Sequence, residues 1–283
     1  GAMREARTRP VTLISASAVG YYGDRGGEPL TETSSAGDGF LSGLGERWEA
    51  AAQQAEALGV RVVRLRTGLV LGQGGGALAA MLPAFSCGLG GPFGSGNQHV
   101  PWIHLHDLAE IIATALVDDR YRGPVNAVAP AGVTSRVFAR ALGRALGRPA
   151  VVRLPALALT AILGRAASVL LASQRVVPRA LAQWRFEFGF PSIEAALDDI
   201  VHGAPVTIMP AGSIPEGAEH ARYELRTRTV VDAPVDETFA FFSRAENLGL
   251  ITPARMGFVI EGSIPAMAAG AIIDYRIRIG AVP

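Results

Sequence analysis

The chain has no lysine, so all 26 of its basic residues are arginines. This absence excludes any mechanism that needs a lysine amine, such as Schiff-base chemistry. The 25 acidic residues nearly balance the arginines, and the formal net charge is only +1. A near-neutral chain lacks the electrostatic footprint of a nucleic-acid-binding protein, so we expect no nucleic-acid partner.

Cysteine is almost as scarce as lysine. The single Cys87 excludes an intrachain disulfide and a cysteine metal cluster, and it fits a reducing compartment. Residues 1–10 contain no apolar segment of the kind found in signal peptides. The most apolar long run, residues 154–172, is interrupted by Pro155, Gly164 and Arg165. We therefore expect a cytoplasmic protein without a membrane span.

The stretch VTLISASAVGYYG at residues 11–23 is the first clear structural signal. Its apolar start is typical of a buried parallel strand, and it continues into a glycine-containing loop rich in hydroxyl groups. Ligands of open α/β sheets bind just beyond the carboxyl ends of the strands. We therefore expect Ser15 and Ser17 to face a ligand crevice. The alternative is a serine-rich turn closed by aromatic packing.

A helix and a second strand follow. Asp38 is the expected N-cap of a helix that ends before Gly59, with Leu44 and Trp48 on its presumed core face. The next strand is VRVVRL at residues 60–65. The order strand, helix, strand with short connections predicts a βαβ unit, and hence a parallel sheet of the α/β class.

Two glycine-rich segments come next. Gly72, Gly74 and Ala77 match the dinucleotide fingerprint G-x-G-x-x-A, but no acidic residue follows until Asp107 to bind a ribose. We therefore interpret these glycines as a loop that opens a helix. Residues 87–99 (CGLGGPFGSGNQH) suit a substrate-side loop, and a plain surface loop is an equally good interpretation.

His104, His106 and Asp107 have a spacing that invites a metal-site hypothesis. Adjacent strand and helix-cap positions would point these side chains in different directions, and no second cluster supports them. Asp107 is better explained as the N-cap of a helix over residues 108–117, so we expect no metal. Further predicted elements are a strand at 125–128 and helices at 137–146 (capped by Thr134 or Ser135), 178–184 and 192–201.

The pattern changes after residue 201. Residues 202–221 contain three prolines and three glycines without sustained periodicity, which predicts a linker. Beyond it we expect strands at 223–231, 257–262 and 272–279 and a helix at 235–243. This order indicates a separate α+β unit, which is too short to close a curved sheet and which we expect to be truncated.

The ordered motifs SASAVGYYGD, ERWEAAA, RTGLVLG, MLPAF, GLGGPFGSGNQ and PWIHLHDLA resemble the epimerase-like atypical group of the extended short-chain dehydrogenase/reductase superfamily. RLPALAL, SQRVVP and FGFPSIEAAL look like the small C-terminal domain of that group, so the resemblance covers residues 11–201. The segment VVDAPVDETFAFFSRAENLGLITP is similar to the first strand and paired helices of the START-like (polyketide cyclase, SRPBCC) helix-grip fold.

These resemblances imply an α/β fold made of four parts. Residues 1–147 would be the C-terminal part of a Rossmann-type sheet without its phosphate loop, and 148–201 a small helical substrate-side domain. Residues 202–221 would be the linker, and 222–283 a truncated α+β helix-grip fragment. Because the family's G-x-x-G-x-x-G loop has no counterpart in residues 1–10, we expect a piece of a longer two-domain protein.

The resemblance also implies roles for individual residues. Ser17 matches the superfamily serine that binds a substrate oxygen. The usual Tyr and Lys four residues apart are missing from the helix, where Leu44 and Trp48 form an i, i+4 pair. Tyr22 is the nearest phenol that could donate the proton instead, and a packing or substrate-lining role is its alternative. The implied cofactor-binding residues are Ser15, Arg66, Thr67, Gly68 and Val70. The implied substrate-side residues are Gly94, Ser95, Gly96, Gln98, Trp102 and His104.

Two functions are compatible with this pattern. The first is an oxidoreductase or epimerase that uses NADP or NAD and acts on an unidentified small molecule. The second is a non-catalytic NAD(P)H-binding sensor whose START-like module binds an apolar ligand. The missing Tyr/Lys pair favours the sensor, whereas the retained serines favour the enzyme.

Overall fold

The structure is a computed structural model, and it divides the chain into two units, Gly1–His202 and Gly203–Pro283. The residues that it describes are 3, 6–153, 155, 157, 171–203, 206–210, 223–227, 233–251, 259–262 and 274–276. Each unit is treated by itself below.

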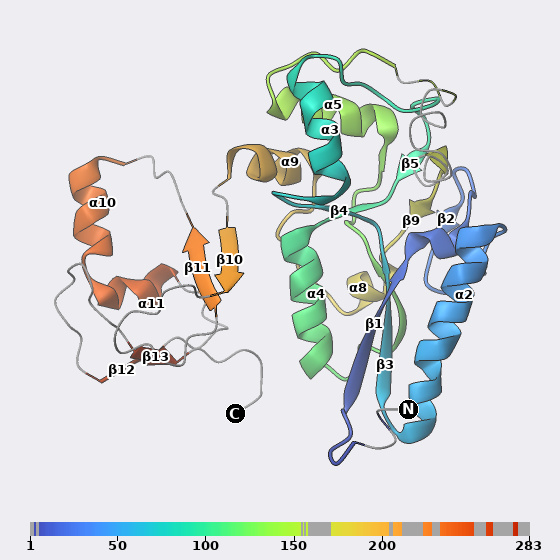
Figure 1. The fold of residues 1–283 in the computed structure, drawn as a ribbon, viewed down its shortest axis with the longest axis horizontal. Helices are drawn as coiled ribbons and strands as arrows, with labels where there is room; N and C mark the ends of the chain where they lie inside the picture. Colours follow the sequence, from blue (N-terminus) through green and yellow to red (C-terminus); the bar gives the residue numbers. More distant parts are fainter. Residues whose placement is uncertain are drawn as a thin grey trace. The chain divides into compact units, whose positions relative to one another are not determined.

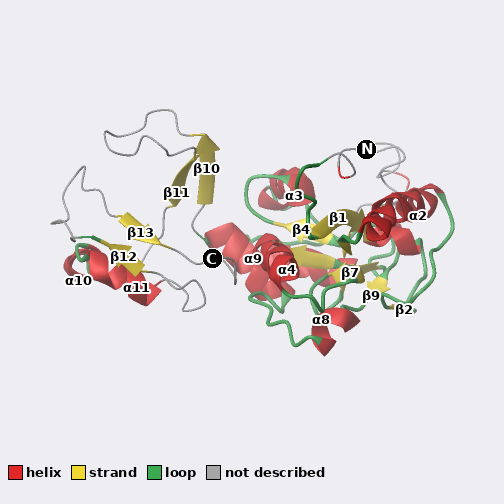
Figure 2. Ribbon diagram, turned by 90° about the horizontal axis from the view of Figure 1, so that it is seen from below, coloured by secondary structure: helices red, strands yellow, loops and turns green. Residues whose placement is uncertain are grey.

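The first unit is organised around three parallel strands in the order β1–β3–β7 (β1 and β3 are labelled in Figure 1 and β7 in Figure 2). Their bounds are Thr12–Ala18 for β1, Arg61–Thr67 for β3 and Gly123–Ala127 for β7. The predicted parallel α/β sheet is therefore confirmed. The register pairs Ser17 with Arg66 and Arg66 with Asn126, so three polar residues form one row across the sheet.

Helices cover both faces of this sheet. On one face Val63 and Leu65 of β3 pack against Ile111 of α4, which spans Leu105–Val117. On the other face lies α2, which spans Phe40–Gln53 and contacts β1 and β3. Figures 1 and 2 show α2 and α4 on opposite sides of the strands. Alternation along β3 therefore sends Val63 and Leu65 to the α4 side and Arg64 and Arg66 to the α2 side.

The start of α2 corrects one prediction. The helix begins at Phe40, after Gly39 in a positive-φ conformation (φ 101°), and no side chain caps it, so Asp38 is not the N-cap. At the other end a 3-10 turn (η2, Gln54–Leu58) leads to Gly59, whose left-handed conformation (φ 78°) ends the helix as predicted.

The orientation of α2 corrects a second prediction. The helix buries Ser42, Gly45 and Glu49, while the side of Leu44 and Trp48 is open, with 39% and 52% of these residues exposed. The apolar pair is thus not in the core. The contacts of the buried side explain this orientation. Gly45 packs against Tyr21, and Glu49 forms ion pairs with Arg64 and Arg66 of β3.

The first unit contains further helices and short strands besides these. Thr134 caps α5 by accepting a hydrogen bond from the backbone N–H of Val137, as predicted. The elements are η1 (Val19–Tyr22), β2 (Pro29–Leu30), β4 (Leu69–Leu71), α3 (Gly76–Ser86), β5 (His99–Val100), β6 (Trp102–His104), β8 (Val133–Thr134), α5 (Ser135–Ala145), β9 (Arg175–Val176), α8 (Arg179–Gln183) and α9 (Ile193–His202). Short parallel pairs join β4 to β6 and β2 to β9, and an antiparallel pair joins β5 to β8.

The start of α4 corrects a third prediction. His104 is the N-cap, and its Nδ1 accepts a hydrogen bond from the N–H of His106. Asp107 lies in the first turn, and its carboxylate instead accepts hydrogen bonds from the N–H groups of Gly189 (2.7 Å) and Phe190 (3.1 Å). In the described part of the chain, no three His, Cys, Asp or Glu side chains gather as a metal-ligand group.

The second unit contains two antiparallel strand pairs and short helices. β10 (Val206–Pro210) pairs with β11 (Tyr223–Thr227), so the predicted linker contains a strand. The β-branched residues at the start of β10 favour a strand, but the surrounding prolines and glycines obscured this pattern in the sequence. The other elements are α10 (Val235–Phe242), η4 (Ala245–Asn247), α11 (Leu248–Ile251) and the pair β12 (Val259–Glu261) and β13 (Asp274–Arg276). The rest of the strands predicted at 223–231, 257–262 and 272–279 lies outside the described residues, apart from Gly262. Among all described helices, none is both long and apolar enough to cross a membrane.

Candidate functional site

A cavity of about 1240 Å³ opens at the carboxyl ends of β1 and β3. One wall is the η1 loop, a second is the apolar side of α2, and a third is the β3–β4 connection. The start of α3 and the turn at residues 99–101 complete it. The only charged carboxylates in this described lining are Asp24 and Asp38, and no arginine belongs to it.

Three of the predicted cofactor-binding residues lie in this lining: Thr67, Gly68 and Val70. Gly68 sits in a tight place, because a Cβ there would come within 2.8 Å of the carbonyl oxygen of Pro101. The chain can therefore pass between two neighbouring segments only with glycine at this position. Ser15, Ser17, Tyr22 and Arg66 do not belong to the lining.

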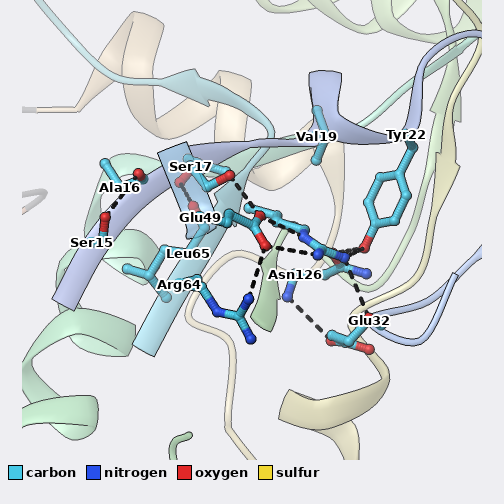
Figure 3. A network of polar contacts seen from close by, with 12 residues as sticks. Ser15, Ala16, Ser17, Val19, Tyr22, Glu32, Glu49, Arg64, Leu65 and Asn126 are labelled. Atoms are coloured by element: carbon cyan, nitrogen blue, oxygen red, sulfur yellow. Dashed lines mark hydrogen bonds and ion pairs between the residues drawn. The ribbon is translucent and has the colours of Figure 1, made fainter. Parts of the chain in front are cut away.

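Beneath the cavity wall lies a buried polar network centred on Glu49 (Figure 3). Arg66 grips this carboxylate with two bonds of 2.8 Å, from Nε to Oε1 and from Nη2 to Oε2. Ser17 Oγ donates to Oε1 at 2.8 Å, and Arg64 Nη1 lies 3.5 Å from Oε2. The side chains of Glu49 and Arg66 are each only 4% exposed. We name Ser17, Tyr22, Glu49, Arg66 and Asn126 the polar network.

The network continues from Arg66 to the third strand. Arg66 Nη1 donates to Tyr22 Oη at 3.0 Å, and Tyr22 Oη lies 2.6 Å from Asn126 Oδ1. The Nδ2 of Asn126 donates to the carbonyl of Val177 at 3.0 Å. The network thereby connects β1, η1, α2, β3 and β7 with the segment after β9. It holds in place the elements that carry the cavity wall.

The titratable members of the polar network are Tyr22, Glu49 and Arg66, and each keeps one protonation state near neutral pH. Burial by itself raises the pKa of Glu49, but the hydrogen bonds from Arg66 and Ser17 and the nearby arginine charges outweigh it, so this pKa is lowered. Burial raises the pKa of Tyr22 despite the opposing effect of Arg66. Tyr22 is therefore a neutral phenol, and Glu49 and Arg66 form a charged pair.

The two predicted serines do not face the cavity. Ser17 directs its hydroxyl to Glu49, and Ser15 Oγ makes a long contact of 3.4 Å with the carbonyl of Ala16. The register explains this, because Ser15 and Ser17 share the face of β1 that α2 covers. Catalytic roles for Ser17 and Tyr22 stay predictions, and the structure gives both side chains partners within the protein.

The glycine-rich loop predicted on the substrate side borders a smaller cavity of about 570 Å³. Gly94, Ser95 and Gln98 line it together with Arg153, whose guanidinium donates to the carbonyls of Gly94 and Ser95. Gly96 packs beside Arg136 and does not belong to this lining. The structure therefore brings three of the six predicted substrate residues together.

Trp102 and His104 lie elsewhere, in the packed interior. Trp102 is 1% exposed, and its Nε1 donates to the carbonyl of Ala131 at 3.1 Å. His104 stacks on Phe190 with ring centroids 3.9 Å apart, and its Nε2 lies 3.3 Å from Oδ2 of Asp199. Burial lowers the pKa of His104. Both side chains hold the sheet to α9 and its neighbouring loop rather than bordering a cavity.

Comparison with known proteins relates this architecture to one family. "Epimerase family protein SDR39U1" of Mus musculus is 43% identical over 202 residues, which are 71% of this chain and 69% of the mouse protein. The chain belongs to this epimerase family. A family model described as "Domain of unknown function (DUF1731)" also matches residues 154–200.

Solved structures show the same family relationship. The human epimerase family protein SDR39U1, crystallised with NADPH, is 39% identical with a TM-score of 0.66 over 71% of this chain and 68% of that chain. A nucleoside-diphosphate sugar epimerase from Corynebacterium glutamicum is 37% identical with a TM-score of 0.59, over 70% of this chain and 39% of that chain.

Sequence reasoning missed several residues of the cavity lining and of the polar network. Tyr21, Leu44 and Trp48 line the large cavity, and Glu49 and Asn126 hold the network. Glu49 could have been found, because an arginine in the middle of a buried strand needs a carboxylate partner. A second signal was the residue pattern of α2, which has small or polar residues along one side and apolar residues along the other.

Proposed function

We propose that this chain forms the nicotinamide and substrate end of an NAD(P)-dependent oxidoreductase or epimerase of the short-chain dehydrogenase/reductase superfamily, acting on a small molecule. The large cavity carries the proposal, because it lies where open α/β sheets bind their ligands, beyond the carboxyl ends of β1 and β3. Thr67, Gly68 and Val70 line it as the family resemblance implies.

The lining fits one end of the cofactor. A reduced nicotinamide is uncharged and flat, and Leu69, Val70 and the apolar side of α2 offer it an apolar wall. No arginine of the described lining could bind a pyrophosphate. NADPH is our preferred cofactor because the human relative was crystallised with it.

When bound, the cofactor would supply a hydride, and the chain's own residues would position the reactants. Leu44 and Trp48 would shield the cavity from water, and Thr67 and Val70 would shape the wall beside the nicotinamide. Gly94, Ser95 and Gln98 remain our proposed substrate-side residues, since they border the smaller cavity with Arg153.

Cofactor binding is tested by titrating the protein with NADPH and following the nicotinamide fluorescence. Leu44→Glu places a carboxylate in the cavity, and we expect affinity to fall roughly tenfold, ~1.4 kcal/mol. Leu116→Glu is the matched control, because Leu116 is an exposed leucine on α4 outside the cavity lining. Turnover is then sought with a panel of carbonyl and sugar-nucleotide substrates. Equal loss of NADPH binding in both variants would contradict the proposed site.

A second function has its own support. Ser17 and Tyr22 are engaged inside the protein, and α2 has neither Tyr nor Lys, which suits a non-catalytic NAD(P)H sensor. The order β11, α10, α11 and the antiparallel pair β12–β13 is compatible with a START-like fragment at residues 222–283 that binds an apolar ligand. NADPH binding without turnover, together with binding of a fluorescent fatty acid, would favour the sensor.

A further inference from the structure

Any reduction of a carbonyl in the proposed site needs a proton donor at the cavity. Tyr22 cannot reach the cavity, because it is fully buried and its hydroxyl is held between Asn126 and Arg66. Ser42 and Thr67 line the cavity, yet their hydroxyls already donate to backbone carbonyls within their own surroundings. None of these three hydroxyls is therefore free to donate to a ligand.

Tyr21, the residue next to Tyr22, has the required position. It belongs to the cavity lining. Among the residues that the structure describes, none forms a hydrogen bond with the Tyr21 hydroxyl, which leaves its proton available to a ligand. Two adjacent tyrosines thus have different surroundings, since one is sealed in the polar network and the other borders the cavity.

The ring of Tyr21 is held by two neighbours on different elements. The guanidinium carbon of Arg66 lies 3.6 Å from the ring centroid, and the backbone of Gly45 in α2 packs against the other parts of the side chain. Arg66 is itself fixed by its two bonds to Glu49. A guanidinium over the face of a phenol ring makes a cation–π contact, which fixes where the ring of Tyr21 lies.

We propose that Tyr21, held in place by the stacked guanidinium of Arg66, is the proton donor of this site, in which the usual Tyr/Lys pair is missing. This inference rests on the proposed function. In the step, a hydride from a reduced nicotinamide dinucleotide forms a C–H bond at the substrate carbonyl carbon. The carbonyl π electrons move to oxygen, the Oη–H bond of Tyr21 breaks, and its proton forms the new alcohol O–H bond. The Tyr21 oxygen then recovers a proton from water.

The first test measures hydrogen bonding without turnover. The dye p-dimethylaminocinnamaldehyde absorbs at longer wavelength when its carbonyl oxygen accepts a hydrogen bond. We expect a red shift on binding to the wild-type chain, retained in Tyr121→Phe, a core tyrosine outside the cavity lining, and absent in Tyr21→Phe. Circular dichroism and thermal unfolding of each variant establish that it is folded. A wild-type chain without the shift, or a shift of equal size in Tyr21→Phe, would overturn the proposal.

The second test separates this inference from the proposed function. Tyr21→Phe should bind NADPH with unchanged affinity while hydride transfer to a carbonyl substrate falls by about 100- to 10,000-fold, the usual contribution of a general acid. Failure of the wild-type chain to bind either NADPH or reduced nicotinamide mononucleotide, which needs no phosphate loop, would refute the proposed function. Normal NADPH binding with full turnover in Tyr21→Phe would refute only the role of Tyr21.

Discussion

The cavity wall and the polar network are made by the same elements and have opposite chemistry. On α2, Leu44 and Trp48 face the cavity, whereas Glu49 faces the sheet, where it pairs with Arg64 and Arg66. The wall is apolar and exposed, and the network is charged and buried. The comparison teaches that stability in this region depends on the polar side of the helix, while the apolar side is free to serve a ligand.

The largest effect on this contrast should come from Glu49→Gln. This change leaves the buried guanidinium of Arg66 without its charged partner, and we expect the free energy of unfolding to fall by about 3–5 kcal/mol. Urea unfolding followed by circular dichroism measures it. Glu46→Gln, an exposed glutamate of the same helix, should change the value by no more than about 0.5 kcal/mol. Similar losses in both variants would remove the distinction between the two sides of α2.

Two tryptophans provide the second comparison. Trp102→Ala empties a site that is 1% exposed and should cost about 3–5 kcal/mol of unfolding free energy. Trp48→Ala removes a side chain of the cavity wall, where the residue is 52% exposed, and should cost less than about 1 kcal/mol. Thermal unfolding measures both. An equally large loss of unfolding free energy in Trp48→Ala would show that the Trp48 side chain belongs to the hydrophobic core and not to a cavity wall.

Two serines on one face of β1 sharpen the contrast further. Ser17→Ala deletes a buried bond to a carboxylate, and we expect a loss of about 1.5–3 kcal/mol in unfolding free energy. Ser15→Ala removes only a long contact and should stay within about 0.5 kcal/mol. Chemical unfolding of the two variants is the measurement. If Ser17→Ala abolished turnover at unchanged stability, a direct catalytic role would be restored to this serine.

The smallest effect is a dependence of stability on pH. The pKa of Glu49 is lower in the folded chain than its value of about 4.3 when unfolded. The unfolded state therefore binds more protons in this range, and the stabilisation is complete above pH 4.3 and is lost as the pH falls through the folded value. Unfolding free energies measured across acidic pH should show a slope that Glu49→Gln weakens and Glu46→Gln preserves. An unchanged slope in Glu49→Gln would show that other carboxylates cause the dependence of stability on pH.

Much of the fold could be predicted because it depends on local signals. The alternation of VRVVRL, the left-handed glycine at position 59 and the threonine cap at position 134 each act within a few residues. Asp38 and Asp107 were predicted as caps by the same reasoning and were wrong. Gly39 in a positive-φ conformation precedes α2 in place of Asp38, and the carboxylate of Asp107 finds its partners 82 and 83 residues away in the chain.

The candidate site was only partly predictable for a related reason. Thr67, Gly68 and Val70 were implied by the family resemblance of the RTGLVLG motif, and they line the cavity. The direction of the Ser17 hydroxyl depends on Glu49 and Arg66, which are separated from it by 32 and 49 positions. No spacing within residues 11–23 contains that information.

The sequence by itself determined the succession of strand, helix and strand, the parallel sheet and the epimerase-family relationship, because periodicity and short motifs are properties of neighbouring residues. Only the tertiary structure decided which stripe of α2 meets the sheet and which of two adjacent tyrosines is sealed inside. The physical reason is that a buried arginine must find a carboxylate, and that pairing of Arg66 with Glu49 turns the helix and leaves Tyr21 at the cavity.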